Sequence, residues 1–237
     1  MYSTLDIVLP CYNPQPGWEW RVIEVYKSIC RQLPEVQTGL IIINDGTSAD
    51  ITESLAHIKA AVPFFIYDSH AKNAGKGFTL RAGVSKSTAE VCIYTDIDFP
   101  YTTESIIRIW NTIADNATDV AAGIKNAEYY THVPTVRKYI SKFLKSMIRI
   151  FFGLSITDTQ CGLKGFNYAG KEIFLQTTIN RYLFDLEFIY LVSKNKQLQL
   201  KPVEIQLRPD IHFRSMNLRI LVTESMNFLK IVLRQIF

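Results

Sequence analysis

Residues 91–100 read VCIYTDIDFP, and this stretch decides the fold. Its first four residues are apolar, β-branched or aromatic, which predicts a buried strand, and Pro100 prevents the strand from continuing. Asp96 and Asp98 therefore stand where the strand ends. Two carboxylates that face one site need a counter-charge, because an unpaired charge is costly to bury. A divalent cation with substrate phosphates supplies it, since Mg²⁺ prefers one or two carboxylates with phosphate oxygens and water. In the alternative, one aspartate caps the following helix and the other is solvated.

The same pattern recurs along the first half of the chain. Strands are predicted over about 5–9, 39–43, 64–67, 91–94 and 119–124. Helices are predicted over about 18–33, 49–61 and 103–114, and a further helix follows residues 71–77 and ends at about 85. Apolar strands that alternate with helices predict an α/β fold, with a Rossmann-like, mostly parallel sheet covered by helices on both faces. Ligands bind beyond the carboxyl ends of such strands. We expect the residues that follow the strand ends to converge there: Tyr12 and Asn13, Asp45 and Gly46, residues 73–77, and Asp96 and Asp98.

Composition narrows the class of protein. The chain has 237 residues, 48% of them hydrophobic and 20% charged, with a formal net charge of +4. These values are ordinary for a globular protein and do not indicate nucleic acid. The four cysteines are far apart and form no C-x-x-C pair, which favours reduced thiols in the cytosol. No apolar run is long enough to span a membrane, and no signal peptide is expected.

Two residues of the first half have alternative roles. Asp45 can accept hydrogen bonds from a base or a ribose, or it can be an ordinary residue of an Asp-Gly turn. Lys76 lies between two glycines at the start of a helix, which suits a phosphate. Equally, it can be an exposed lysine in a glycine-rich turn. Neither a Walker loop nor a dinucleotide-binding fingerprint is present in the sequence.

The second half begins with a basic, amphipathic helix over about 136–152. Apolar residues recur there at helical spacing, with five basic residues and no acidic residue between them. This pattern favours contact with an anionic membrane surface, although a surface helix packed on the sheet would show it too. Arg137 or Lys142 can also hold an acceptor phosphate. The chain ends with a half-exposed strand over about 198–207 and a helix over about 218–236.

Three carboxylates of this half are candidates for the site. Asp158 lies in a predicted loop and can act as a general base, orient the acceptor, or cap a turn. Asp185 and Glu187 lie in the first turn of a predicted helix, where they favour the helix dipole. The same position can also bring either of them into the acceptor site.

Four stretches of the first half resemble the successive motifs of family 2 glycosyltransferases, in the same order and at similar spacing: 8–13, 43–48, 73–77 and 95–98. The resemblance implies a GT-A fold and a nucleotide-diphospho-sugar used with Mg²⁺ or Mn²⁺. It implies that Asp96 lies near the ribose or sugar and that Asp98 binds the metal, with Asp96 beside it. The other residues that it assigns to the nucleotide-sugar are Pro10, Tyr12, Asn13, Asp45, Gly46, Asn73 and Lys76. Pro14 stands where the family usually has glutamate.

Residues 158–164, 184–187 and 214–218 resemble the polyprenyl-phosphate branch of that family, especially dolichyl-phosphate glucosyltransferases. In that branch the sugar passes to a lipid phosphate with inversion. The resemblance makes Asp158 the candidate active-site carboxylate, and Arg214 and Ser215 candidate phosphate binders. The loop before Arg214 departs from the branch, because it carries a histidine and a phenylalanine where an acidic-Gly or Tyr-Gly pair is common.

The hypothesis from the sequence is one glycosyltransferase domain, with residues 1–124 binding the donor and residues 125–237 the acceptor. It transfers a sugar, with UDP-glucose favoured as donor, to a polyprenyl phosphate. We expect it to be cytoplasmic and peripheral on the inner face of the membrane. Two alternatives stay open: a transferase that extends a cell-surface glycan, and a catalytically silent nucleotide-sugar binder.

Overall fold

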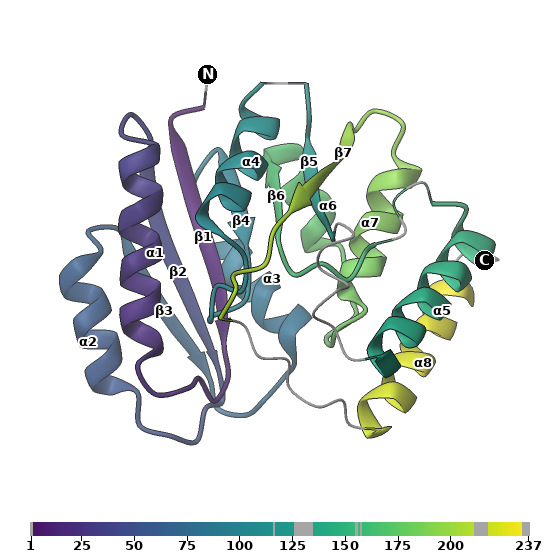
Figure 1. Ribbon diagram of the computed structural model, residues 1–237, viewed down its shortest axis with the longest axis horizontal. Helices are drawn as coiled ribbons and strands as arrows, with labels where there is room; N and C mark the ends of the chain where they lie inside the picture. The colour runs from purple at the N-terminus through teal and green to yellow at the C-terminus, as the bar shows by residue number, and fades with distance from the viewer. Residues whose placement is uncertain are drawn as a thin grey trace.

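A seven-stranded sheet forms the centre of the molecule in the computed structural model (Figure 1), which describes residues 2–115, 117–125, 135–154, 156, 158–210 and 218–233. The strand order is β3-β2-β1-β4-β6-β5-β7, and all neighbours are parallel except that β6 runs antiparallel to β4 and β5. The strands are β1 (Thr4–Cys11), β2 (Gln37–Asp45), β3 (Phe65–His70), β4 (Val91–Tyr94), β5 (Val120–Lys125), β6 (Lys164–Asn167) and β7 (Leu200–Ile205). The predicted α/β class and mostly parallel sheet are confirmed.

Helices cover both faces of the sheet, as the sequence predicts. In Figure 1, α1 and α4 cross in front of the sheet and α3 lies behind it. The helices are α1 (Trp18–Gln32), α2 (Thr52–Ala61), α3 (Lys76–Lys86), α4 (Thr103–Ala114), α5 (Thr135–Phe152), α6 (Tyr168–Leu175), α7 (Phe184–Lys194) and α8 (Leu218–Leu233). Neither α6 nor the strand β6 was expected from the sequence.

Successive side chains of the central strands point to opposite faces of the sheet and form two apolar cores. Leu40 and Ile42 of β2 pack into the core under α1, α2 and α4, whereas Ile41 and Ile43 pack into the core under α3 and α7. Successive side chains of a strand point to opposite faces, so a strand buried on both faces must be apolar throughout. This is why the sequence signal for β1, β2 and β4 is a continuous apolar run.

Three predicted elements differ in detail. The strand expected over 64–67 is the edge strand β3, and Ile66 and Tyr67 on it are exposed, so it is not a buried strand. The first residues of the helix expected from 49 stay outside α2, because the carboxylate of Asp50 accepts a hydrogen bond from the Thr52 amide at 2.9 Å. Residues 164–167, for which no strand is predicted, form β6 between β4 and β5, because their short KGFN sequence gives no periodic signal.

The helices α5 and α8 lie side by side at one end of the sheet (Figure 1), joined by ring contacts of Phe151 and Phe152 with Phe228 at centroid distances of 5.9 and 5.4 Å. The sequence predicts a single apolar face for α5, and the structure divides it. Ile148 and Phe152 pack into the core, while Phe143 is exposed. No helix in the described residues is long and apolar enough to cross a membrane.

Candidate active site

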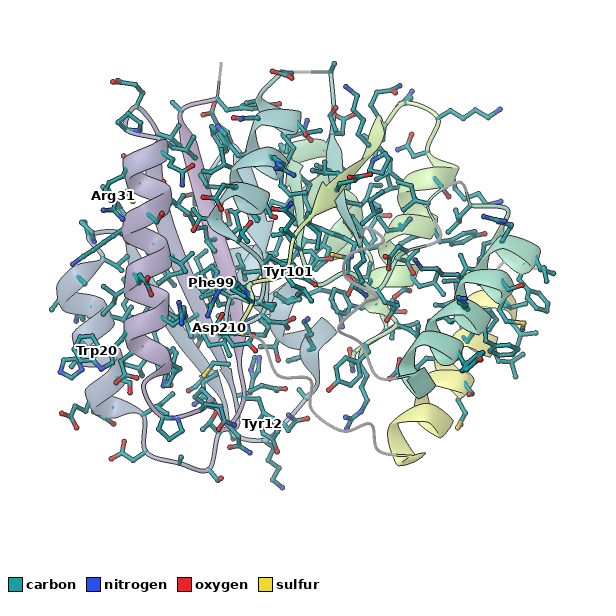
Figure 2. All side chains as sticks on the ribbon, viewed as in Figure 1. Tyr12, Trp20, Arg31, Phe99, Tyr101 and Asp210 are labelled. Carbon is teal, nitrogen blue, oxygen red and sulfur yellow. The ribbon has the colours of Figure 1, made fainter. Side chains whose placement is uncertain are left out.

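A cleft of about 1320 Å³ opens at the carboxyl ends of the parallel strands. The residues predicted to bind the donor that line it come from four separate stretches of the sequence: Pro10, Tyr12, Asp45, Asn73, Lys76, Asp96 and Asp98. The expected convergence at one edge of the sheet therefore takes place. Phe99, Tyr101 and Asp210 lie close together in Figure 2, and Tyr12 lies nearer the end of β1.

Asp45 holds together the floor of the donor side of the cleft. Its carboxylate is almost fully buried and accepts hydrogen bonds from the Ala74 amide at 2.7 Å and the Gly75 amide at 3.0 Å. Gly46 has a φ of 73°, and a Cβ there would lie 2.7 Å from the Asn73 amide nitrogen. Only glycine tolerates that close approach without strain. Asp45 and Gly46 thus fix the loop that leads into α3.

Asn13 and Tyr12 have different roles. The side-chain oxygen of Asn13 accepts a hydrogen bond from the Ser48 backbone amide at 3.2 Å, and the backbone amide of Asn13 donates to the Thr47 hydroxyl at 3.1 Å. Asn13, with a φ of 44°, therefore shapes the rim by joining the loops after β1 and β2. Tyr12 projects into the cleft with its ring half exposed, where it can stack on a planar ligand.

Lys76 pairs with Asp96 across the cleft floor, with 2.5 Å between the ammonium nitrogen and the carboxylate oxygen. Burial alone would lower the pKa of Lys76, but the charges of Asp96 and Asp185 outweigh it and raise the pKa above its usual value. Lys76 therefore stays protonated at neutral pH. It is not the exposed turn lysine of the alternative interpretation.

Asp98 lies on a turn that Arg208 holds in place. The Arg208 guanidinium donates to the backbone carbonyl of Phe99 at 3.0 Å and to that of Asp98 at 3.4 Å, and Phe99 has a φ of 44°. The guanidinium also pairs with Asp210, which is 3.1 Å from Arg21. This clamp leaves the Asp98 carboxylate exposed at the cleft.

The carboxylates fit a divalent cation that shares its coordination with substrate. Within the described residues, no group of three His, Cys, Asp or Glu side chains could hold a metal by itself. Asp98 and Asp96 nevertheless lie two residues apart at the cleft, and Mg²⁺ needs only one or two carboxylates when phosphates and water complete its shell. They fit a metal that arrives with a diphosphate.

The loop over residues 158–162, which contains the predicted Asp158, contributes Gln160 and Gly162 to the wall of the cleft. The Tyr101 hydroxyl accepts a hydrogen bond from the Gly162 amide at 3.1 Å. A Cβ on Gly162 would lie 2.7 Å from a carboxylate oxygen of Asp96 and 3.3 Å from the Lys76 ammonium. The loop therefore lies directly against the Lys76–Asp96 ion pair, because position 162 has no side chain.

We expect Gly162→Ala to impair nucleotide binding without unfolding the protein. The added methyl group displaces the flexible ends of Asp96 and Lys76 and meets no backbone there, so the free energy of unfolding should fall by less than about 1 kcal/mol. Calorimetric titration with UDP and Mn²⁺, beside thermal unfolding, checks this. Unchanged nucleotide affinity would contradict the position given to the loop.

Asp158 begins this loop and is not among the residues that line the cleft. Its carboxylate is 7% exposed and accepts a hydrogen bond from the Lys125 amide at 3.0 Å. The ammonium groups of Lys125 and Lys145 lie 3.6 and 3.3 Å from it. The role of a general base requires a carboxylate that can reach the acceptor, and these contacts do not favour that role.

Asp185 lines the cleft and forms a buried ion pair with Lys164. One carboxylate oxygen of Asp185 accepts from the Tyr94 hydroxyl at 2.6 Å and from the Lys164 ammonium at 2.5 Å. Lys164 is fully buried and also donates to the carbonyls of Thr159 and Cys161 at 3.0 and 2.6 Å. Burial and the Asp185 charge raise the pKa of Tyr94 well above its usual value. The sequence analysis named Asp185 as a site candidate, but it did not predict the pairing of Asp185 with Lys164.

Glu187 has a different role from the predicted contact with the acceptor. It is buried, and one of its oxygens accepts hydrogen bonds from the amides of Thr178 and Ile179, each at 2.8 Å. These bonds hold the turn between α6 and α7. The structure thus places Glu187 in this turn, and Glu187 is not among the residues that line the cleft.

Of the remaining predicted residues, the structure describes the side chain of Lys142, which does not line the cleft. Lys142 is exposed on α5, and the side chain of Arg137 on the same helix is outside the described part of the chain, as are Arg214 and Ser215. Basic and polar residues that sequence reasoning missed also line the cleft: Arg21, Lys125, Gln160, Arg181, Tyr182 and Arg208. They come from strands, helices and loops that are far apart in the sequence, and the fold brings them together.

The model of Glycosyl transferase family 2 matches residues 6–173, well over half of the chain. The chain belongs to glycosyl transferase family 2. It is 27% identical over 218 residues to a dolichyl-phosphate β-glucosyltransferase of Trichomonas vaginalis, covering 87% of this chain and 64% of that protein. A dolichyl-phosphate β-glucosyltransferase of Dictyostelium discoideum is 27% identical over 204 residues, covering 80% and 62%. The chain thus spans less than two thirds of these relatives.

Solved structures support the same fold. Glucosyl-3-phosphoglycerate synthase from Mycobacterium tuberculosis, in complex with Mn²⁺, UDP and phosphoglyceric acid, superposes with a TM-score of 0.68 at 14% identity, covering 98% of this chain and 78% of that one. The same enzyme was also solved with Mg²⁺ and UDP. The identity is low, so this likeness shows the GT-A fold of the family 2 chain and no more.

Proposed function

We propose that this family 2 chain transfers a sugar from a nucleotide-diphospho-sugar, with UDP-glucose favoured, to a polyprenyl phosphate at a membrane surface. The single observation that carries the proposal is the convergence of Tyr12, Lys76, Asp96 and Asp98 in one cleft. The names of the relatives support a glucosyl donor and a dolichyl-phosphate acceptor. We further propose that residues 1–124 bind the donor and residues 125–237 the acceptor, within one domain.

The proposed reaction is a direct displacement. An acceptor phosphate oxygen attacks the anomeric carbon from the side opposite the diphosphate, and the bond to the diphosphate breaks as the new carbon–oxygen bond forms. The configuration inverts, and the nucleoside diphosphate leaves with the bonding electron pair. Because a phosphate oxygen is already anionic near neutral pH, this acceptor needs no general base. The contacts of Asp158 are consistent with such a reaction.

Different residues of the cleft would bind the metal, the phosphates and the base of the donor. Asp98 and Asp96 would hold a divalent cation, which supplies positive charge to the leaving diphosphate when it is bound. Lys76, at the N-terminus of α3, adds an ammonium group where backbone amides also favour an anion. When phosphates arrive, they can share Lys76 with Asp96. Tyr12 offers its half-exposed ring to the base.

The outer surface of α5 and α8 supports a lipid acceptor. Tyr139, Phe143 and Ile150 are 70%, 67% and 71% exposed, and their spacing places them on one face of α5. Met226, Leu229 and Leu233 form a second exposed stripe on α8. The exposed basic residues beside the stripes are Lys142, Arg149 and Lys230. Apolar side chains fringed with basic ones suit an anionic bilayer.

We expect the double variant Phe143→Ser/Ile150→Ser to bind anionic vesicles about a hundredfold more weakly, since each lost apolar contact is worth about tenfold in partitioning. Cosedimentation with vesicles of phosphatidylcholine and phosphatidylserine measures this. Ile66→Ser, on the exposed edge strand β3, is the matched control and should bind as the wild type does. Equal binding by all three proteins would refute the membrane contact.

An acceptor panel tests the proposed function. Purified protein with Mn²⁺ and UDP-glucose is given a short polyprenyl phosphate, the corresponding free polyprenol, or an oligosaccharide. Transfer to the phosphate alone is the expected result. Transfer to the oligosaccharide would replace the proposal by glycan extension, and nucleotide binding without transfer or donor hydrolysis would replace it by a silent binder.

A further inference from the structure

Asp158 joins two elements that are far apart in the sequence. One oxygen of its buried carboxylate accepts from the backbone amide of Lys125, at the end of β5. The same oxygen lies 3.3 Å from the ammonium of Lys145, in the middle of α5. A buried carboxylate thus connects the sheet to α5, whose outer face carries the exposed apolar side chains of Tyr139, Phe143 and Ile150.

The contact continues from Asp158 into the cleft. The Lys125 ammonium donates to the Gln160 carbonyl at 3.3 Å, and both residues line the cleft. Two residues further on, Gly162 is held by Tyr101 and lies against Asp96. The loop over 158–162 is therefore anchored at one end by Lys125 and Lys145 and at the other end by Tyr101.

Three described side chains of α5 make apolar contacts with the fold. Leu144, Ile148 and Phe152 pack into the core, and such packing has no preferred direction. A charged pair fixes position more strictly, because a buried carboxylate that loses its partners is costly. Lys145, beside Leu144 on the inner side of α5, supplies that fixed point.

We propose that Lys145 and Asp158 are positioning residues, through which α5 sets the position of Lys125 and of the loop over 158–162 on the acceptor side of the cleft. Asp158 then acts as an anchor and not as a general base. The kinetic part of this inference rests on the proposed function, whereas its structural part does not.

The variants must remove the charge pair without removing the fold. Asp158→Asn keeps an oxygen for the Lys125 amide, and Lys145→Met keeps the length of the side chain. Lys145→Arg restores the charge. The matched control is Lys86→Met, which breaks an exposed ion pair with Asp68 at 2.8 Å on another part of the surface.

Hydrogen exchange of backbone amides tests the anchor directly. We expect Lys145→Met and Asp158→Asn each to accelerate exchange at Lys125 and over 158–162 by at least about tenfold, with no further gain in the double variant. Lys145→Arg should exchange as the wild type does, and Lys86→Met should leave these amides unchanged. Wild-type exchange in both Lys145→Met and Asp158→Asn would overturn the proposal.

Transfer kinetics separate an anchor from a base. If Asp158 is an anchor, Lys145→Met and Asp158→Asn should raise the KM for polyprenyl phosphate by similar factors, while kcat and its pH profile change little. A large fall in kcat together with loss of the acidic limb of its pH profile in Asp158→Asn, with Lys145→Met unaffected, would overturn the role of Asp158 as an anchor. If no acceptor is glycosylated, the proposed function fails and hydrogen exchange still decides this inference.

Discussion

Asp98→Ala is expected to lower sugar transfer by about three orders of magnitude, because it removes the carboxylate proposed to hold the metal and, with it, several kcal/mol of charge stabilisation of the leaving diphosphate. The Asp98 carboxylate is exposed at the cleft, and its turn is held through backbone contacts of Arg208. The fold should therefore survive. Transfer rates at saturating Mn²⁺, with calorimetric titration of UDP in the presence of Mn²⁺, measure the effect.

Asp68→Ala is the matched control for this variant. Asp68 is also an aspartate at the surface, but it pairs with Lys86 on the edge of the sheet and lies outside the cleft. Its rate and UDP affinity should equal those of the wild type. If Asp98→Ala kept Mn²⁺-dependent UDP binding and transfer, the role of Asp98 in holding the metal would have to be abandoned.

Lys164→Met is expected to have the largest effect on stability, lowering the free energy of unfolding by about 3–5 kcal/mol. The substitution leaves the Asp185 carboxylate buried without its cation, and the carbonyls of Thr159 and Cys161 lose a donor. The hydroxyl of Tyr94 remains, but one neutral hydrogen bond does not replace an ammonium group. Urea unfolding at neutral pH measures the change.

Lys86→Met provides the comparison, because exposed ion pairs contribute only about 0–1 kcal/mol. The ion pair of Lys86 with Asp68 has both side chains well exposed to solvent. A fall of under 1 kcal/mol in Lys164→Met would show that Asp185 is neutral or solvated in the folded protein. The double variant Lys164→Met/Asp185→Asn should recover part of the loss.

Much of the donor side could be predicted from local sequence. The apolar runs before Asp45 and Asp96 are strands buried on both faces, and a parallel sheet brings their ends to one edge. The positions of Asp45, Lys76, Asp96 and Asp98 follow from that rule. The contacts of these residues do not follow from it. The hydrogen bonds from the loop before α3 to Asp45 depend on the close approach of that loop to Gly46.

The acceptor side depends on contacts between distant parts of the chain. A four-residue strand that contains Lys164 and Gly165 has no periodic pattern, so β6 and the buried Lys164–Asp185 pair could not be predicted. The division of the apolar side chains of α5 between the core and the surface could not be predicted either. Helical spacing identifies an amphipathic helix, but it does not tell whether Ile148 or Phe143 faces the core.

The most direct measurement of the central claim is mass spectrometry of the lipid product after incubation of the protein with UDP-glucose, Mn²⁺ and a short polyprenyl phosphate in anionic vesicles. The account predicts a polyprenyl phosphate that has gained one hexose, formed with release of UDP and absent when Asp98→Ala replaces the wild type. Unmodified polyprenyl phosphate, with the donor intact although UDP binds in the cleft, would contradict it.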